Sequence, residues 1–388
     1  MSDPHEHLMV VAAKPEPVMV RGRGCFLYDR DGREYLDFVQ GWAVNLLGHS
    51  PQLVQETLAA QAAELIHAGP GYHNQVAARL ADRLAQLSGL DRVFLATSGA
   101  EANEGAIKLA RKWGAVHRGG AYGIITTEGG FHGRTLATMA ASGKPGWDVL
   151  FEPKVPGFQK VPFGDAGAVE AAIDDEVIAI MVEPIQGEAG VVVPPEGYLR
   201  ALRQLADRHG LLLIVDEIQT GMGRSGRFLA CDWEGVRPDI MTLGKGLGAG
   251  VPISALLSRE SVCCFEPGDQ GGTFGGNALM AAVGLAVAEL VAEPAFLANC
   301  LERGQQLQRG LEALAARHGG GPPRGKGLLL ALPLAADVAP AVVACALERG
   351  LLLNAPRPGL LRLMPALNVS AEEIELCLER LGASLAAV

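Results

Sequence analysis

The fold is decided by the stretch Leu211-Leu-Leu-Ile-Val-Asp-Glu-Ile-Gln219 together with Thr242-Leu-Gly-Lys-Gly-Leu-Gly-Ala-Gly250, which follows it along the chain. The apolar run predicts a buried strand that ends at the carboxylate of Asp216. In open α/β sheets, ligands bind at the carboxyl ends of the strands, which is where Asp216 falls. Lys245 stands among glycines, which allow a ligand to approach the backbone closely.

Further apolar runs lie on both sides of this stretch and alternate with segments of helical period. Runs that are apolar on both faces, separated by helices, favour a mostly parallel sheet covered on both sides, and therefore an α/β fold. The strands are expected at 92–96, 122–126, 177–182 and 211–215, and the helices between them at 101–113 and 199–209.

The two ends of the chain have a different pattern. Around Asp31-Gly32, residues 23–39 are typical of a β-hairpin, and helical periodicity follows from Pro51 to Leu87. After Gly276 we expect an Ala- and Leu-rich helix to about Ala316, then a glycine-rich break, short strands and a last helix at 371–385. The predicted organisation is an N-terminal segment (1–50) packing with a small α+β C-terminal domain (277–388), beside a large domain (51–276).

Composition excludes several classes of function. A net charge of −10 over 388 residues disfavours nucleic acid and anionic membranes as partners. The most apolar segment, 328–347, is interrupted by Pro333, Asp337 and Pro340, so we expect no membrane span. The N-terminus does not resemble a secretory signal, and the cysteines form no C-x-x-C pair, so we expect a cytoplasmic protein with reduced thiols and no metal site.

Lys245 and Asp216 fit the needs of one cofactor, pyridoxal 5'-phosphate (PLP). PLP enzymes need a lysine that forms a Schiff base and a carboxylate that keeps the pyridine nitrogen protonated. Each residue also has a plainer explanation, since a carboxylate at a strand end often caps a helix and a lysine in a glycine loop is often only solvated. The glycines match neither the G-x-G-x-x-G fingerprint nor a Walker motif.

Two further motifs fit the same ligand. In Thr97-Ser-Gly-Ala-Glu-Ala-Asn-Glu104, small residues at a helix N-terminus favour phosphate binding, although an ordinary N-cap by Ser98 explains them equally well. In Phe131-His-Gly-Arg-Thr135, the aromatic ring suits a flat cofactor and Arg134 suits a carboxylate. Taken singly, Phe131 is more often a core residue and Arg134 more often a surface ion-pair partner.

Together and in order, these motifs resemble the class III (ω-) aminotransferases of PLP fold type I. Within that class the chain is most similar to the acetylornithine aminotransferases of arginine biosynthesis. The resemblance runs from about Val18 to the C-terminus. It includes Gly41-Trp-Ala-Val-Asn-x-x-Gly-His49, Ser98–Glu104, Phe131–Thr135, Glu183-Pro-Ile-Gln-Gly-Glu188, Asp216-Glu-Ile-Gln-Thr-Gly221, Lys245 and Thr273-Phe-Gly-Gly-Asn277.

The resemblance implies a cofactor site and a homodimer with shared active sites. Lys245 would form the Schiff base and move protons, Asp216 would pair with the pyridine nitrogen, and Gln219 would bind the ring oxygen. The remaining implied contacts are the ring sandwich of Phe131 and Ile218, and the phosphate ligands Ser98, Gly99 and Ala100, joined by Thr273 of the partner subunit.

The resemblance also implies a substrate site. Arg134 would grip a substrate carboxylate in a pocket lined by Gly272. Arg362 would hold the α-carboxylate of glutamate or 2-oxoglutarate. Glu188 would pair with Arg362 while an ω-amine donor is bound, because an unpaired buried arginine is costly. Such enzymes transfer the terminal amine of N-acetylornithine, or of a related acylated diamino acid, to 2-oxoglutarate.

The chain departs from the family pattern at three places. Gly271 replaces a common histidine, Ala278 replaces a proline, and Trp42 is bulkier than usual. These departures bear on substrate choice, so an ornithine or 4-aminobutyrate aminotransferase stays open as an alternative. A same-fold aminomutase or decarboxylase does not need the Glu188/Arg362 pair, and intact Lys245 and Asp216 disfavour a non-catalytic binding protein.

Overall fold

The computed structural model describes residues 7–388 and contains a central sheet of seven strands in the order β4-β10-β9-β8-β7-β5-β6. Only β10 runs antiparallel to its neighbours, so the expected mostly parallel sheet is confirmed. The strands are β4 (Arg92–Ala96), β5 (Gly123–Thr127), β6 (Phe158–Val161), β7 (Val177–Val182), β8 (Leu212–Asp216), β9 (Ile240–Leu243) and β10 (Ser254–Ser258).

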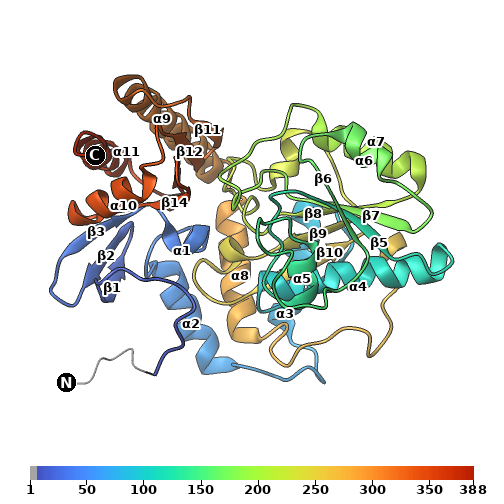
Figure 1. Ribbon diagram of the computed structural model, residues 1–388. Helices are drawn as coiled ribbons and strands as arrows, with labels where there is room; N and C mark the ends of the chain where they lie inside the picture. The colour runs from blue at the N-terminus through green and yellow to red at the C-terminus, as the bar shows by residue number, and fades with distance from the viewer. Residues whose placement is uncertain (1–6) are drawn as a thin grey trace.

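Helices cover both faces of this sheet. Successive residues of β8 enter different cores: Leu213 packs in one apolar cluster and Ile214 in the other, as expected for a strand buried on both sides. In Figure 1, helices α6 and α7 lie above the sheet, and α4 and α5 lie below it. These helices are α4 (Gly99–His117), α5 (Leu136–Ala141), α6 (Ala166–Ala171) and α7 (Tyr198–His209).

The N-terminal strands form a separate sheet that includes a strand from the C-terminal part. β1 (Met19–Arg23), β2 (Phe26–Asp29) and β3 (Glu34–Asp37) are antiparallel, which confirms the predicted hairpin. β3 then pairs in parallel with β13 (Leu351–Leu352). The N-terminal segment therefore lies against residues that follow it by more than three hundred positions, at the left of Figure 1.

The C-terminal part combines an antiparallel sheet with helices. The sheet has the order β11-β12-β15-β14, and α9 packs against both β12 and α11. The elements are β11 (Arg324–Lys326), β12 (Leu329–Pro333), β14 (Asn354–Arg357), β15 (Leu360–Leu363), α9 (Pro294–His318), α10 (Ala339–Glu348) and α11 (Ala371–Leu385).

The apolar helix expected after Gly276 is two helices. α8 (Ala278–Val291) ends before Pro294, which begins α9, and the two are bent by 72°. Proline suits the first turn of a helix but not its interior, which explains the break. α8 packs against α2 (Gln52–Glu64) and α3 (Gln75–Ser88). In Figure 1 it stands between the N-terminal sheet and the central sheet. Within residues 7–388, no single helix is long and apolar enough to cross a membrane.

Candidate active site

A cavity of about 260 Å³ opens at the carboxyl ends of β7 and β8, beside the N-terminus of α4. It brings together most of the side chains that the sequence motifs single out. Its lining residues are Gly99, Ala100, Phe131, His132, Gly133, Arg134, Glu183, Glu188, Asp216, Ile218, Gln219 and Lys245. Ser98, Arg362, Gly272 and Thr273 do not line it.

Lys245 follows β9 in a short 3₁₀ turn (Lys245–Gly248) and has a positive φ of 43°. Such backbone strain in a non-glycine residue tends to be kept at functional sites. Burial lowers the pKa of the Lys245 ammonium; the positive charge of Arg362 acts in the same direction and the negative charge of Glu188 against it. A lysine whose pKa is lowered is a better nucleophile and base than a solvated one.

Asp216, at the end of β8, has three nitrogen groups within 3.0 Å of its carboxylate oxygens. Asn103 Nδ2 donates to Oδ2 at 2.8 Å, and His132 Nδ1 lies 2.8 Å from the same oxygen. The backbone N–H of Ile218 donates to Oδ1 at 3.0 Å. Asn103 is oriented in turn by Thr242 Oγ1, which donates to its Oδ1 at 2.8 Å. The carboxylate is thus fixed in position and directed at the cavity.

His132 is buried, and two opposing effects set its charge. Burial lowers the pKa of the imidazole, but the hydrogen bond and negative charge of Asp216 outweigh it and raise the pKa overall. No role was predicted from the sequence for His132, Asn103 or Thr242, although all three stand inside the motifs that predict the site.

Glu183 is a second buried acid beside this group. Its Oε1 accepts a hydrogen bond from the backbone N–H of Phe131 at 2.8 Å. Burial raises the pKa of Glu183 to about 7, while the positive charge of His132 opposes this and the negative charge of Asp216 adds to it. Glu183 therefore titrates near neutral pH, within the wall of the cavity. It also went unassigned at the level of sequence.

The N-terminus of α4 has both features that its sequence suggests, an N-cap at Ser98 and free amides that suit an anion. Ser98 Oγ accepts from the N–H of Glu101 at 3.3 Å, and the Glu101 carboxylate accepts from the N–H of Ser98 at 2.7 Å. This is a full capping box. Gly99 and Ala100 nevertheless line the cavity, and the first amides of a helix have no intrahelical acceptor. The capped helix therefore still offers an anion site there.

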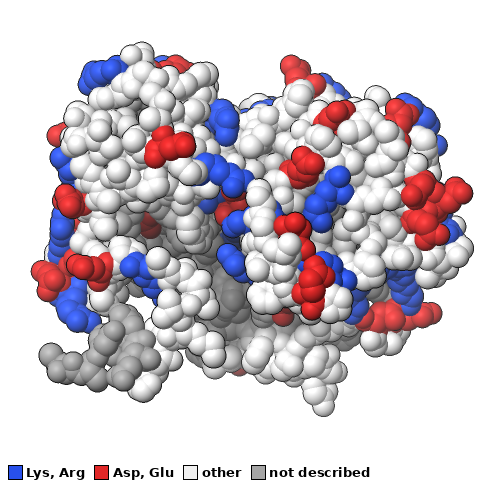
Figure 2. Space-filling view, in the orientation of Figure 1, with Lys and Arg blue, Asp and Glu red and all other residues white. Residues whose placement is uncertain are grey.

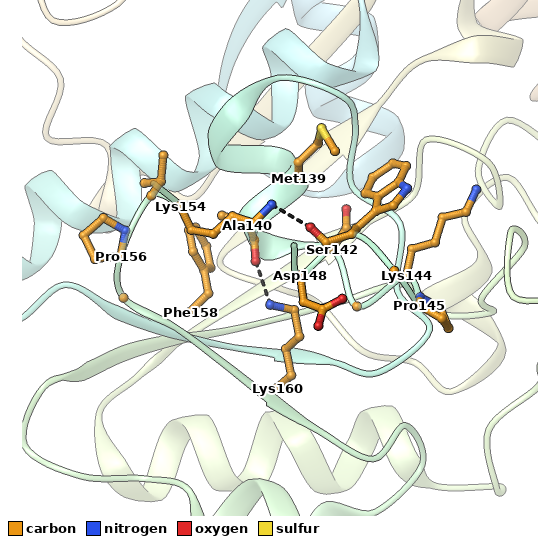
Figure 3. Close-up of a pocket in the computed structure, with 15 residues that line it drawn as sticks. Met139, Ala140, Ser142, Lys144, Pro145, Asp148, Lys154, Pro156, Phe158 and Lys160 are labelled. Atoms are coloured by element: carbon orange, nitrogen blue, oxygen red, sulfur yellow. Dashed lines mark hydrogen bonds between the residues drawn. The ribbon is translucent and has the colours of Figure 1, made fainter. Parts of the chain in front are cut away.

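Phe131 and Arg134 both pack on Trp147. The ring centroids of Phe131 and Trp147 are 5.6 Å apart, and Arg134 Cζ lies 5.3 Å from the centroid of Trp147. A second cavity, of about 630 Å³, lies along the segment that carries Trp147 (Figure 3). There Lys154 Nζ donates to the carbonyl of Trp147 at 2.6 Å, and Lys160 Nζ donates to that of Ala140 at 2.8 Å. Lys154 therefore fastens the Trp147 segment, and Lys160 fastens the end of α5.

Arg362 lies on β15, in the C-terminal sheet, and meets the cavity through Glu188, which lines it. Its side chain is fully buried and Nη1 donates to Glu188 Oε1 at 2.8 Å. Nη1 also donates to the carbonyl of Gly187 at 2.7 Å, and Nε donates to Asn354 Oδ1 at 2.9 Å. Burial opposes ionisation of Glu188, but the charges of Arg362 and Lys245 lower its pKa overall. Figure 2 shows this face of the molecule hollowed between its two parts.

The turn after β3 has an unusual backbone. Residues Gln40, Gly41, Trp42 and Ala43 have φ values of 49°, 60°, 66° and 65°, which is a left-handed turn. Each non-glycine residue in this conformation costs about 1–2 kcal/mol. The turn directs Trp42 toward the site, because the Arg362 guanidinium carbon lies 5.3 Å from the centroid of its ring.

Gly272 and Thr273 lie in the exposed loop that follows β10. Two side chains of α4 hold this loop: Lys112 pairs with Asp269, and Lys108 donates to Gln270. The adjoining Phe274 is 61% exposed, although its side chain is large and apolar. Within one chain, the structure does not bring Gly272 or Thr273 to the cavity.

Comparison with known proteins gives the family. The model of the family described as aminotransferase class-III matches residues 10–385. The chain belongs to the class III aminotransferases. This class III aminotransferase is 55% identical to acetylornithine aminotransferase 2 of Bordetella bronchiseptica, over 98% of this chain and 97% of that one. It is 52% identical to the acetylornithine aminotransferase of Ralstonia nicotianae, over 96% and 95% of the two chains.

Solved structures agree with this assignment. An ornithine aminotransferase from Toxoplasma gondii superposes with a TM-score of 0.94 at 36% identity, covering 99% of this chain and 93% of that one. The N-acetylornithine aminotransferase of Stenotrophomonas maltophilia gives a TM-score of 0.85 at 36% identity, with 96% coverage of both. Class III aminotransferases use PLP, and a Toxoplasma gondii ornithine aminotransferase structure has PLP at its active site. This enzyme is accordingly a PLP-dependent transaminase.

The residues present fit PLP. Gln219 Nε2 is a buried donor with no acceptor among residues 7–388, and Gln219 lines the cavity, where a ring oxygen would satisfy it. Lys245 and Asp216 line the same cavity, and the α4 N-terminus offers free amides for a phosphate.

Proposed function

We propose that this class III aminotransferase transfers the terminal amino group of N-acetylornithine, or of a related acylated diamino acid, to 2-oxoglutarate. The products are the semialdehyde and glutamate, and the step belongs to arginine biosynthesis. The observation that carries the proposal is the buried Arg362–Glu188 pair, 2.8 Å long, beside Lys245. The names of the Bordetella and Ralstonia relatives support the same donor.

The cavity residues would divide the work as follows. When bound, PLP supplies an electron sink for the carbon that gains or loses the amine. Lys245 would hold the cofactor and move the proton at that carbon. Asp216, held in position by His132 and Asn103, would hold a proton on the ring nitrogen. The remaining contacts would be Gln219 to the ring oxygen, Phe131 and Ile218 on the two ring faces, and Ser98, Gly99 and Ala100 at the phosphate.

Arg362 and Glu188 would let one site accept two kinds of substrate. An ω-amine donor carries no carboxylate next to its reacting carbon, so Arg362 needs a partner while that donor is bound. Glu188 supplies this partner, since a buried unpaired charge costs several kcal/mol. When 2-oxoglutarate enters, its carboxylate takes the place of Glu188. Arg134 would bind the carboxylate at the other end of either substrate.

A free-ornithine donor is the main alternative, because the superposition on the Toxoplasma ornithine aminotransferase is also close. Gly41 argues for an acylated donor, because ornithine aminotransferases are expected to have a tyrosine there. An aminomutase or decarboxylase would not need the Arg362–Glu188 pair. Rates with N-acetylornithine, N-succinylornithine, ornithine and 4-aminobutyrate separate these possibilities. A clear preference for free ornithine would replace the proposed substrate.

The assembly is proposed to be a homodimer with shared active sites. Thr273 is exposed and lies away from its own cavity, which suits a residue that completes the phosphate site of the partner subunit, with Gly272 lining the same pocket. The proposed domains are 51–276 and 277–388, with residues 1–50 attached to the second. The pairing of β3 with β13 supports that attachment. The cytoplasm stays the expected location.

An absorbance spectrum of the purified holoenzyme tests the proposed function. The visible band of the bound cofactor should bleach when N-acetylornithine is added and return with 2-oxoglutarate. A band that does not respond to N-acetylornithine but bleaches with ornithine or 4-aminobutyrate would mean that the enzyme is an aminotransferase with a different donor. The Glu188→Gln variant, which cannot neutralise Arg362, should lose rate with the donor more than with glutamate.

A further inference from the structure

The left-handed turn at Gln40–Ala43 is strained, yet several hydrogen bonds hold it in place. Asp37 Oδ1 accepts from the N–H groups of Val39 and Gln40 at 2.8 and 2.9 Å. Asp37 Oδ2 lies 2.9 Å from His49 Nε2, and Gln40 is fully buried. A conformation that costs free energy and is held by a buried network is expected to serve a purpose in the native state.

The consequence of this turn is the position of one ring. Trp42 faces Arg362, whose Cζ lies 5.3 Å from its centroid, yet 49% of the Trp42 surface stays exposed. Burial of the indole therefore does not explain why the strained turn is kept. A cation within about 6 Å of an indole face is attracted to it, most of all where water is excluded, as around the fully buried Arg362.

The guanidinium of Arg362 is only partly satisfied by its neighbours. Nη1 and Nε have acceptors in Glu188, Gly187 and Asn354, but Nη2 is buried without an acceptor among residues 7–388. Two parallel N–H···O bonds to a carboxylate need a planar fork that keeps its orientation. The Trp42 ring, whose centroid lies 5.3 Å from the guanidinium carbon, would restrict the tilt of that fork.

We propose that Trp42 is a specificity-determining residue for the 2-oxo acid and acts by positioning Arg362. Its ring holds the guanidinium plane in the orientation in which the carboxylate of 2-oxoglutarate or glutamate replaces that of Glu188. The residue would therefore set affinity for the amino acceptor and leave binding of the ω-amine donor almost unchanged. This inference rests on the proposed function, in which Arg362 binds that carboxylate.

Two substitutions at position 42 distinguish the effect of the indole ring from the effect of the backbone turn. Trp42→Gly removes the ring and keeps the turn, because glycine adopts positive φ without strain. Trp42→Phe keeps an aromatic face over Arg362. Trp113→Phe, on α4 and outside the cavity, is the matched control for tryptophan content.

The probe is glutarate, an inert five-carbon dicarboxylate, titrated into the holoenzyme by calorimetry. We expect Trp42→Gly to weaken glutarate binding about 10-fold and Trp42→Phe about 2- to 3-fold, with Trp113→Phe unchanged. In apoprotein, glutarate should change the tryptophan fluorescence of the wild type and of Trp113→Phe. The change should be smaller in Trp42→Phe, where only Trp147, beside Arg134, lies near a carboxylate-binding arginine of the described residues. This second readout does not depend on cofactor or on activity.

Kinetics complete the test. In Trp42→Gly the KM for 2-oxoglutarate should rise about as much as the glutarate Kd, while the KM for N-acetylornithine changes less than 2-fold. Unchanged glutarate affinity in Trp42→Gly overturns the inference. A change confined to the KM for the donor also overturns it, and would mean that Trp42 lines the donor pocket. Failure of the wild type to use N-acetylornithine, with glutarate binding still dependent on Trp42, would refute the proposed donor alone.

Discussion

At the scale of single residues, the site is a set of charges removed from water and balanced against one another. His132 and Asp216 form one opposite pair, and Arg362 and Glu188 form another, both with bonds of 2.8 Å. Lys245 lies between carboxylates and an arginine whose charges affect its pKa in opposite directions. Among residues 7–388, Glu183 has no oppositely charged partner within hydrogen-bond distance, and its ionisation is therefore the least compensated of the group.

Glu183 gives a prediction for the pH dependence of stability. Burial raises the pKa of Glu183 from 4.5 to about 7, so between these values the folded state binds a proton that the unfolded state releases. The free energy of unfolding should therefore fall as pH rises from about 4.5 to 7, by about 3 kcal/mol from this group. Glu183→Gln should remove that contribution.

Urea unfolding of the wild type and Glu183→Gln at several pH values measures this difference. The free energy of unfolding of Glu183→Gln, relative to that of the wild type, should increase as pH rises and should level off above about pH 7. Exposed Glu196, replaced by Gln, serves as the control and should show no such trend. A difference that stays constant from pH 4.5 to 8 would contradict the raised pKa.

Gly187 gives a prediction for cofactor affinity. A Cβ at this position would lie 1.6 Å from Gln219 Oε1 and 2.6 Å from its Cδ, so Gly187→Ala must displace the Gln219 side chain. Loss of one hydrogen bond to the ring oxygen should weaken PLP binding about 10-fold. Dialysis followed by PLP titration measures the affinity. Gly71→Ala, where a Cβ would meet nothing within 4 Å, should bind PLP like the wild type. An equal loss of PLP affinity in both variants would contradict a role for displacement of Gln219.

The sequence predicts some of these residues and misses others, for a physical reason. Lys245 and Asp216 stand out because their residue types, in a glycine loop and at a strand end, match a definite chemistry. His132, Asn103 and Thr242 act only by holding another side chain. Their partners lie on other elements, as with Asn103 on α4 and Asp216 on β8, so no local spacing indicates the contact.

At the scale of elements, the helix that points at the cavity depends on its cap. Ser98 Oγ and the Glu101 carboxylate satisfy each other's backbone N–H groups at the start of α4. Ser98→Ala should lower the free energy of unfolding by about 1 kcal/mol, and Ser98→Thr by less, because threonine also caps. Urea unfolding of the apoprotein measures this without interference from cofactor. Equal stability of Ser98→Ala and the wild type would show that the cap contributes nothing.

Element bounds were predictable where a regular period met a clear signal. The expected ends of β4, β7 and α11 agree with the structure, and α11 begins after Ser370, which forms a capping box with Glu373. The break before Pro294 is visible in the sequence, but its neighbours are strong helix formers and suggest one continuous helix. The left-handed turn at Gln40–Ala43 was not predictable, because a network centred on Asp37, rather than local propensity, imposes it.

At the scale of the whole molecule, the site is assembled from two sheets. Arg362 and Glu188 are 174 positions apart in the chain and meet where β15 faces the loop after β7. Alternation of strands and helices predicts the central sheet but not its partnership with the C-terminal sheet. Only resemblance to the class III family indicated that Arg362 would pair with Glu188 at the cavity.

The proposed homodimer makes a prediction about mixtures. If Thr273 completes the partner's phosphate site, Thr273→Asp would place a negative charge beside that phosphate and should abolish activity at limiting PLP. Lys245→Ala should be inactive in its own site, by at least about 10³-fold. In a mixed dimer, one site would carry both changes and the other neither.

An equal mixture, left until subunits have exchanged, should therefore recover about a quarter of the wild-type activity, since half of the dimers would be mixed and each would hold one intact site. Differently tagged subunits and native mass spectrometry show when exchange is complete, so slow exchange is not mistaken for a negative result. As a control, Lys245→Ala mixed with Asp216→Ala should recover nothing, because each site would draw both residues from one subunit and every site would lack one of them. Equal inactivity of both mixtures after complete exchange would mean that each chain forms its site alone.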